Sequence, residues 1–387
     1  MGESLRLLQA GDVNLDVPLY GIGDLPDELQ RHLANARYES FRSLIDAAIH
    51  RRVDAIVLAG NLLPVRLPGS PARWFLHEQF SRLTAHAITV LVRGDALPTP
   101  PAGLAWPENV VPTAARHAVR WMTRSQQTVR VSDGLHPYDL SGVADHQLVV
   151  GGQLPTQQRI DHSPGTFWAC SDDSAVTAGS SNLDRAHRCG PLQGSGFEDC
   201  GPHGAWELAI ERGQYRDLRL VACDAVHWQQ EELLLDSSST RTTVLTEMVN
   251  RATQLHKRAG TTTVVRWLLS GEGELLNTFW SPRVRQDLLD EARKRCPTGC
   301  SMAGLEVATA AQQRDDLQES SLVSAFRHTL STLTQSETID FLLIGDFDSQ
   351  SIPSGCRMLS RQRYLDHLEP RIVERLRGDL LPTARSA

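Results

Sequence analysis

Three short apolar runs near the start of the chain, each ending at a glycine followed by a polar residue, constrain the fold most. The runs at 5–10, 53–59 and 88–92 have the length and composition of buried strands. Residues 27–51 and 71–86, which lie between them, carry apolar side chains at helical spacing. Strands and helices that alternate in this way predict βαβ units and a largely parallel, buried sheet.

The pattern is weaker after residue 97. Residues 97–112 hold five prolines and predict a connection that runs over the surface. A strand is predicted at 146–150, whereas residues 165–204 are rich in Gly, Ser, Asp and Cys and are predicted to be mostly loop. Late strands are expected at 205–210 and 217–221.

A polar linker at 236–241 precedes a second block of regular structure. Its predicted elements are a helix at 243–259, a strand at 261–270, a helix at 282–295 and a strand at 305–308. Amphipathic helices are predicted further on, at 316–334 and 360–377. The sequence therefore predicts three parts, with bounds 1–235, 242–315 and 316–387.

Composition limits the classes of function. The net charge of −7 argues against binding nucleic acid through bulk charge alone, although it leaves a local basic groove open. Seven scattered cysteines do not form a disulfide framework and suit a reducing cytosol. No apolar run approaches the roughly 18–20 residues of a membrane span, and the first residues lack a secretory-signal pattern. We expect a cytoplasmic protein that is not embedded in a membrane.

Four of the predicted strands end in the same way, with a glycine and then a short polar group. These ends are Gly11-Asp12-Val13-Asn14, Gly60-Asn61, Gly94-Asp95 and Gly152-Gln153. In a parallel α/β sheet, functional groups gather in the crevice at the carboxyl ends of the strands. Oxygen-bearing side chains that converge there suit a hard or borderline cation, or a phosphate held through that cation.

These segments carry a resemblance to the calcineurin-like metallophosphoesterases. Within them the chain resembles the DNA-repair exonuclease branch of SbcD-type and YhaO-like nuclease subunits, whose motifs run H-x-S-D-x-H-L-D-x-P, V-D-x-x-x-x-A-G-D, V-x-x-x-x-G-N-H-D and A-L-G-H-x-H. The corresponding segments here are LQAGDVNLDVPLYG, RRVDAIVLAGNLL, ITVLVRGDAL and LVVGGQLP. Residues 196–205 resemble the family's E-x-G-P-x-G segment, and residues 224–228 resemble the segment that closes the phosphoesterase domain.

The resemblance implies a layered α/β fold: a metallophosphoesterase-type β-sandwich flanked by helices, a small α+β capping domain and C-terminal helices. It also implies two metal ions, usually manganese, that polarise a phosphodiester and activate a water. Carried over to this chain, Asp12 matches the first-motif aspartate. Asn14 stands at the first-motif histidine, Asn61 at the bridging aspartate and Asp95 at the third-motif asparagine.

The remaining motif positions are replaced by residues of different chemistry. Ala96 stands at the histidine that the family links to leaving-group protonation, and Leu97 at the aspartate that orients it. Gln153 and Pro155 stand at the two histidines of G-H-x-H, and His136 is the one candidate for the middle histidine and for a catalytic residue. Alanine, leucine and proline side chains neither ligate metals nor transfer protons, so the manganese site is expected to be vestigial: Asp12, Asn14, Asn61, Asp95 and Gln153.

The sequence thus predicts a catalytically silent pseudoenzyme that serves as a scaffold or regulatory subunit. By resemblance its partner is an SbcC-like coiled-coil ATPase, with DNA and a homodimer as further associations. A weak phosphodiesterase that uses one metal at Asp12, Asn14, Asn61 and Asp95 is the alternative, and a crevice that binds a nucleotide or another small ligand without turnover is a third.

Simpler interpretations compete with these assignments. Asp12 and Asp95, each after a glycine, also suit helix caps and turns. Cys296 and Cys300 have a metal-site spacing but no second Cys/His pair nearby, so no structural zinc is predicted. Trp106, Trp121 and Trp168 could stack on bases, but tryptophans more often pack beneath loops.

Overall fold

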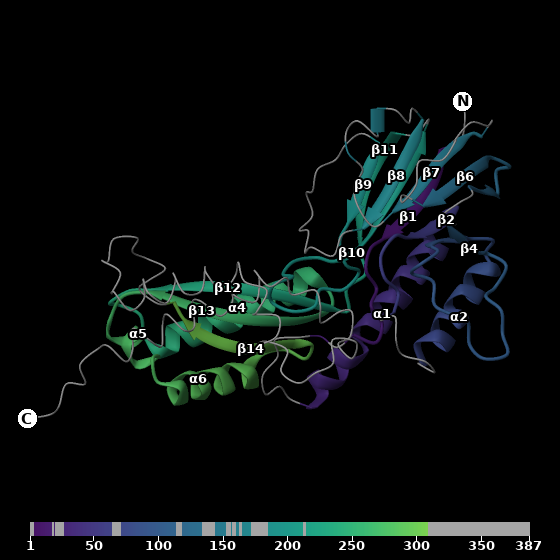
Figure 1. Ribbon diagram of the computed structural model, residues 1–387. Coiled ribbons are helices and arrows are strands. Elements are labelled where there is room, and N and C mark those ends of the chain that lie inside the picture. Colours follow the sequence, from purple (N-terminus) through teal and green to yellow (C-terminus); the bar gives the residue numbers. More distant parts are fainter. Residues whose placement is uncertain are drawn as a thin grey trace, which may run out of the picture. The chain divides into compact units, whose positions relative to one another are not determined.

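The alternating pattern of the first hundred residues folds into one side of a six-stranded sheet in the computed structural model. The sheet order is β11-β10-β1-β2-β3-β4, in which β1 to β4 are parallel and β10 and β11 are antiparallel additions (Figure 1). The strands are β1 (Leu5–Ala10), β2 (Ala55–Leu58), β3 (Thr89–Arg93), β4 (Val110–Thr113), β10 (Gly204–Glu211) and β11 (Gln214–Ala222). The helices between the first strands are α1 (Asp27–Arg51) and α2 (Pro71–Thr84).

The structure describes eleven stretches of the chain: 4–17, 19, 27–63, 71–113, 118–133, 144–151, 156, 160–161, 165–171, 185–211 and 214–308. The described residues up to Glu306 belong to one compact unit. The helices predicted at 316–334 and 360–377 lie outside the described residues. The three predicted domain ranges stay predictions.

A second sheet packs against the first. Its order is β5-β6-β7-β8-β9, and its strands are β5 (Val119–Met122), β6 (Thr128–Asp133), β7 (His146–Gly151), β8 (Thr166–Ser171) and β9 (Ala186–Cys189). The prediction that residues 165–204 are mostly loop is wrong for β8 and β9. All six residues of β8 are buried, so the strand lacks the polar alternation that marks a half-exposed strand in a sequence.

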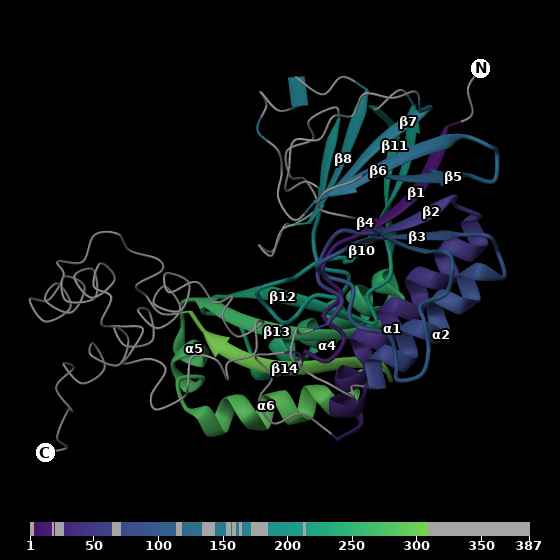
Figure 2. The same ribbon diagram turned by 45° about the vertical axis from the view of Figure 1, so that its right-hand side comes forward.

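Two apolar clusters cover the two faces of the six-stranded sheet. On one face, Phe41 and Phe80 of the helices pack against residues such as Ile56 of the strands. On the other face, Leu7 and Val57 pack against side chains of the five-stranded sheet, such as Phe167. Figures 1 and 2 show α1 and α2 on one side of the sheet and β5 to β9 on the other. The described chain is thus a mixed α/β fold in which sheet packs on sheet.

The predicted second block forms a three-stranded sheet with helices. The sheet order is β12-β13-β14, and β12 runs parallel to β13. Its elements are β12 (Val226–Leu235), α4 (Arg241–Ala259), β13 (Thr262–Gly271), α5 (Glu274–Thr278), α6 (Pro282–Arg295) and β14 (Cys300–Val307). Strand β14 begins five residues before the predicted start at 305, because the run from 300 to 304 contains small residues that hide the pattern.

Local sequence signals explain the bounds of α4. Thr240 precedes the helix and its hydroxyl accepts a hydrogen bond from the amide of Thr243, while Thr243 reciprocates through its own hydroxyl. Gly260 ends the helix in the left-handed region at φ 70°, which glycine adopts without steric cost. No helix among the described residues has both the length and the apolar character needed to cross a membrane.

Candidate functional site

The loops that follow β1 and β2 are joined by backbone hydrogen bonds at the predicted crevice. The amides of Val13 and Asn14 both donate to the carbonyl oxygen of Asn61, at 2.9 and 3.1 Å. The amide of Leu15 donates to the carbonyl of Leu62 at 3.0 Å, which extends the pairing beyond the strands. Asn14 adopts a left-handed conformation, φ 47°, which asparagine tolerates better than most residues. The parallel sheet therefore brings Asp12, Asn14 and Asn61 together.

Asp12 is buried at the base of this crevice, with 5% of its surface exposed. Its Oδ1 accepts a hydrogen bond from the backbone amide of Asn61 at 2.6 Å. A β-carbon on Gly60 would lie 2.3 Å from that same oxygen and 2.5 Å from the amide nitrogen of Asp12. Glycine is therefore required at residue 60 for the carboxylate to reach the neighbouring loop.

Arg93, at the end of β3, is the residue that the sequence analysis missed. Its Nε donates to Oδ1 of Asp95 at 2.5 Å, and its Nη2 donates to Oδ1 of Asn61 at 3.3 Å. Its Nη1 donates to the carbonyl of Ala59 at 3.2 Å. Only 17% of the arginine side chain is exposed, against 58% of that of Asp95. A guanidinium cation thus lies among oxygens from the ends of β2 and β3.

Arg93 could have been noticed in the sequence as a charged residue in an otherwise apolar run, directly before Gly94-Asp95. The direction of its side chain depends on the tertiary structure. In the folded protein the side chain points toward the end of β2, where it contacts Asn61. The arginine therefore connects two of the predicted ligand residues to each other.

Arg37 of α1 holds the loop after β1 from the other side. It is 3% exposed, and its Nε donates to the carbonyl of Val17 at 2.8 Å. Its Nη2 donates to the hydroxyl of Ser195 at 3.0 Å, so it also contacts the segment after β9. Because carbonyl and hydroxyl oxygens satisfy this buried cation, its role is to fix the loop.

A buried polar cluster lies beneath the crevice, between β1 and β9. Gln9 donates through Nε2 to the carbonyl of Cys170 at 2.8 Å, and its Oε1 lies 3.0 Å from Nδ1 of His187. Burial lowers the pKa of His187 to about 4, so the imidazole is neutral near pH 7 and donates from Nδ1 to the amide oxygen. Burial also raises the pKa of the Cys189 thiol, which keeps that sulfur protonated. Neither group adds negative charge to the crevice.

The carboxyl end of β8 lies beside Gly11, the glycine that follows β1. A β-carbon on Gly11 would lie 3.0 Å from the hydroxyl oxygen of Ser171 and 2.2 Å from the carbonyl oxygen of Gly190. Ser171 therefore lies beside the predicted crevice, and the sequence analysis did not select it. The signal for it was the apolar run 166–170 that ends at a serine.

The downstream segment that resembles E-x-G-P-x-G has mainly structural contacts. The imidazole of His203 lies 2.9 Å from the carbonyl oxygen of Asp199 and 3.3 Å from that of Pro191. His227 lies 2.9 Å from the buried carboxylate of Asp224. These histidines are paired within their own segment.

The other two predicted site residues lie outside the described part of the chain. His136 and Gln153 are outside the described part of the chain, so their assignments stay predictions. In the described ranges, no group of three His, Cys, Asp or Glu side chains is arranged to hold a metal ion. The two tryptophans Trp121 and Trp168 are buried, which fits packing rather than stacking on bases.

The donors described here do not fit a pair of manganese ions. Asn61 supplies a neutral amide oxygen, and that oxygen already accepts a hydrogen bond from Arg93. The carboxylate of Asp95 is paired with the same guanidinium. A divalent ion among these oxygens would have to displace a cation that is held by three hydrogen bonds.

Comparison with known proteins points to the class that the sequence motifs suggest. No family model matches the chain. A stretch of 113 residues nevertheless supports the metallophosphoesterase family, because it is 38% identical to a curated member. That relative is the uncharacterized metallophosphoesterase YhaO of Bacillus subtilis (strain 168), and the match covers 28% of this chain and 28% of the relative. The matched part spans only about a quarter of the relative's length.

Proposed function

We propose that this chain is a non-hydrolytic relative of the metallophosphoesterases, in which the metal crevice has become a structural junction. One observation carries the proposal: Arg93 bonds both Asn61 and Asp95, at two of the predicted ligand positions. Asp12 is bonded to the Asn61 amide in the same junction. The polar groups at the three strand ends thus hold the loops to one another.

This arrangement lacks the electrostatics of a two-metal phosphoesterase. Such a site needs several anionic or imidazole ligands around open coordination positions. Among the predicted ligand residues that the structure describes, only Asp12 and Asp95 carry a carboxylate, and Asp95 is neutralised by Arg93. Ala96 and Leu97 supply no proton donor at the third motif. A chain with these properties is suited to a scaffold or regulatory role.

A Mn²⁺ titration by calorimetry, paired with hydrolysis of bis-p-nitrophenyl phosphate, tests the proposal. We expect the wild type to show no binding in the micromolar range and no Mn²⁺-dependent hydrolysis. Micromolar binding that is lost in Asp12→Ala, with hydrolysis lost in Asp12→Ala/Asp95→Ala, would overturn it. That outcome would support the single-metal phosphodiesterase at Asp12, Asn14, Asn61 and Asp95.

Arg93→Gln sharpens the same test. Removing the guanidinium frees the oxygens of Asn61 and Asp95, so weak Mn²⁺ binding is expected to appear in this variant. Arg219→Gln is the matched control, because Arg219 also pairs with an aspartate two residues away, Asp217, but on the exposed strand β11. Binding that is the same in wild type, Arg93→Gln and Arg219→Gln would contradict a blocking role for Arg93.

The partner that we propose is an SbcC-like coiled-coil ATPase, on the basis of the resemblance in the sequence motifs. Affinity purification of the full chain from its native extract, followed by mass spectrometry, tests this proposal. Recovery of an ATPase with long coiled-coil segments would support it. Monomeric behaviour with no such ATPase recovered would contradict it, without affecting the conclusion about metal binding.

A further inference from the structure

A pocket of about 310 Å³ lies at the opposite edge of the six-stranded sheet from the crevice. It is lined by Ile49, His50, Arg52, His86, Ile88 and Arg124. The first three residues lie at the end of α1, and the next two lie between α2 and β3. These helices lead into the amino ends of β2 and β3, whereas Asn61 and Asp95 follow their carboxyl ends. The pocket is therefore separate from the site described above.

The lining of this pocket is basic and contains no carboxylate. Two arginines and two histidines line it in a chain whose net charge is −7. Three acidic residues near the pocket have other partners: Asp46 pairs with Arg82, Glu207 pairs with Arg6 and Arg51, and Asp54 accepts a hydrogen bond from the backbone amide of Arg6. No carboxylate lines the pocket beside Arg52 and Arg124, and within the described part of the chain neither arginine forms an ion pair with one.

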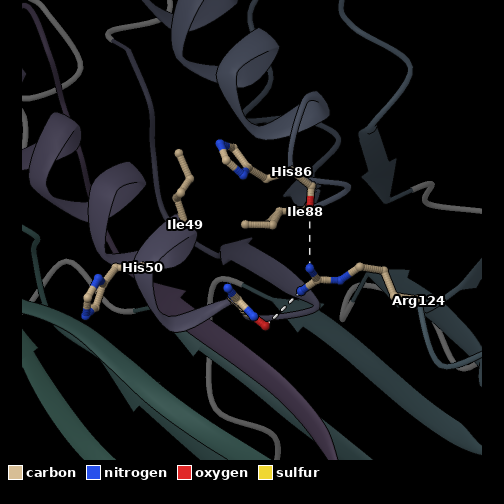
Figure 3. Close-up of a pocket in the computed structure, with 6 residues that line it drawn as sticks. Ile49, His50, His86, Ile88 and Arg124 are labelled. Atoms are coloured by element: carbon tan, nitrogen blue, oxygen red, sulfur yellow. Dashed lines mark hydrogen bonds between the residues drawn. The ribbon is translucent and has the colours of Figure 1, made fainter.

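Arg124 holds the pocket together. Its Nη2 donates to the carbonyls of Arg52 and Val53 at 2.8 and 2.6 Å. Its Nη1 donates to the carbonyl of His86 at 3.4 Å, a contact drawn in Figure 3. These carbonyls belong to the chain just beyond the ends of two helices, where backbone oxygens lack helical partners. By satisfying them, Arg124 also offsets their partial negative charge, which would otherwise repel an anion.

The pocket also has an apolar part, and it lies beside the carboxyl ends of two helices. Figure 3 shows the Ile88 side chain and the His86 ring near Ile49, while the His50 ring lies beyond Ile49. Arg52 and Ala87 both have left-handed backbone, φ 54° and 52°, although neither is glycine. Each of these residues lies at the carboxyl end of a helix, α1 or α2, where a left-handed residue is a common way for the helix to end. Apolar surface beside basic side chains that have no carboxylate partner matches a ligand with an organic body and an anionic group.

We propose that this pocket binds a small phosphate ester of mononucleotide size. Arg52 and His86 bind the phosphate, Arg124 supplies further positive charge, and Ile49 and Ile88 contact the organic part. The volume lies at the lower end of the range for small-molecule pockets, roughly 300–1,000 Å³, which suits one nucleotide better than a larger cofactor. This site does not depend on the metal crevice.

Calorimetric titration of the full chain with AMP, adenosine and inorganic phosphate tests the proposal. We expect AMP to bind below millimolar concentration, phosphate to bind more weakly and adenosine to show no binding. Arg52→Gln is expected to weaken AMP binding by roughly tenfold, because charge-assisted contacts to phosphate are the strong ones. His86→Gln is expected to weaken it severalfold.

Arg82→Gln is the matched control, since Arg82 lies in the last turn of α2, four residues before His86, but pairs with Asp46 outside the pocket lining. It should bind AMP like the wild type, and unchanged thermal unfolding would show that each variant is folded. Absence of AMP binding up to about 5 mM would overturn the proposal, because that corresponds to only about 3 kcal/mol of affinity. Equal affinity in wild type and Arg52→Gln would also overturn it.

One further binding measurement distinguishes a small phosphate ester from a nucleic-acid backbone as the ligand. A single-stranded oligonucleotide without terminal phosphates offers only phosphodiesters. Arg52-dependent binding of this oligonucleotide without binding of AMP would overturn the small-ligand proposal in favour of a strand contact.

Discussion

Charged groups have opposite surroundings at the two ends of the parallel strands in the six-stranded sheet. We call these ends the carboxyl edge and the amino edge of the sheet. At the carboxyl edge, the Asp95 carboxylate is paired with Arg93 and the buried Asp12 accepts the amide of Asn61. At the amino edge, Arg52 and Arg124 line a pocket without a carboxylate. In parallel α/β sheets the carboxyl edge is where binding sites are expected. Here its polar groups bind the loops together, and the basic side chains without a carboxylate partner lie at the other edge.

This difference shows that polar groups near a sheet can have two distinct roles. A group whose hydrogen-bonding capacity is used by its neighbours stabilises the fold but has little left for a ligand. A charge without a nearby counterion favours binding of an oppositely charged molecule. The two edges can therefore be distinguished by substitutions that measure stability at one and ligand binding at the other.

The largest effect is expected at the carboxyl edge from Gly60→Ala. The new β-carbon would lie within 2.5 Å of backbone atoms of Gly11 and Asp12, so the two loops must separate. We expect a loss of about 3 kcal/mol or more in the free energy of unfolding, measured by urea titration. Gly304→Ala is the control, because its β-carbon would meet no atom closer than 3.9 Å, and it should change stability by less than about 0.5 kcal/mol. Similar losses in both variants would show that the contact between the two loops is not tight.

The next effect concerns pH and the buried His187 beneath the same edge. Its pKa falls from 6.5 to about 4 on folding because burial disfavours the charged imidazole. The unfolded chain therefore binds the proton more readily, and stability falls as the pH drops from above 6.5 toward 4. The full contribution is of order 3 kcal/mol.

Urea unfolding of wild type and His187→Gln at pH 7, 6 and 5 measures this contribution. The wild type should lose more stability on acidification than the variant, because glutamine has no proton to gain. Parallel stability curves for the two proteins would mean that His187 does not titrate in this range.

A smaller effect is expected from Arg93→Gln, which removes the connection between Asn61 and Asp95. Because Arg93 is largely buried and also donates to the carbonyl of Ala59, we expect a loss of about 1–2 kcal/mol. The exposed pair Arg219–Asp217 provides the comparison, and Arg219→Gln should cost less than about 0.5 kcal/mol. If both substitutions cost the same, the carboxyl edge is no more tightly connected than the open surface.

The smallest effect on stability is expected at the amino edge, from Arg82→Gln. The pair between Arg82 and Asp46 is exposed on both sides, so its loss should change the free energy of unfolding by less than about 0.5 kcal/mol. Raising the salt concentration should reduce this difference further. A loss above about 1 kcal/mol would show that the surface around the pocket is held by its ion pairs.

Much of the sheet-and-helix order was predictable because local patterns were strong. Helix α1 has both of the bounds that apolar spacing predicted, since a long amphipathic helix repeats its signal over many turns. Strand β8 was missed because both of its faces are buried, so it shows no alternation, and because it lies within a range, 165–204, that is otherwise rich in loop-forming residues. The pairing of β12 with β13 was not predictable either, because the sequence of a strand does not specify its partner.

The sequence alone determined which residues stand at the strand ends, and therefore that Asn61 brings no charge and Ala96 no proton donor. Only the tertiary structure decided that Arg93 reaches Asn61, and that residues from 49–52, 86–88 and 124 line one pocket. The physical reason is that strand periodicity is a local property of the chain. The direction of a long charged side chain depends on which oxygens the packed sheets and helix ends place within its reach.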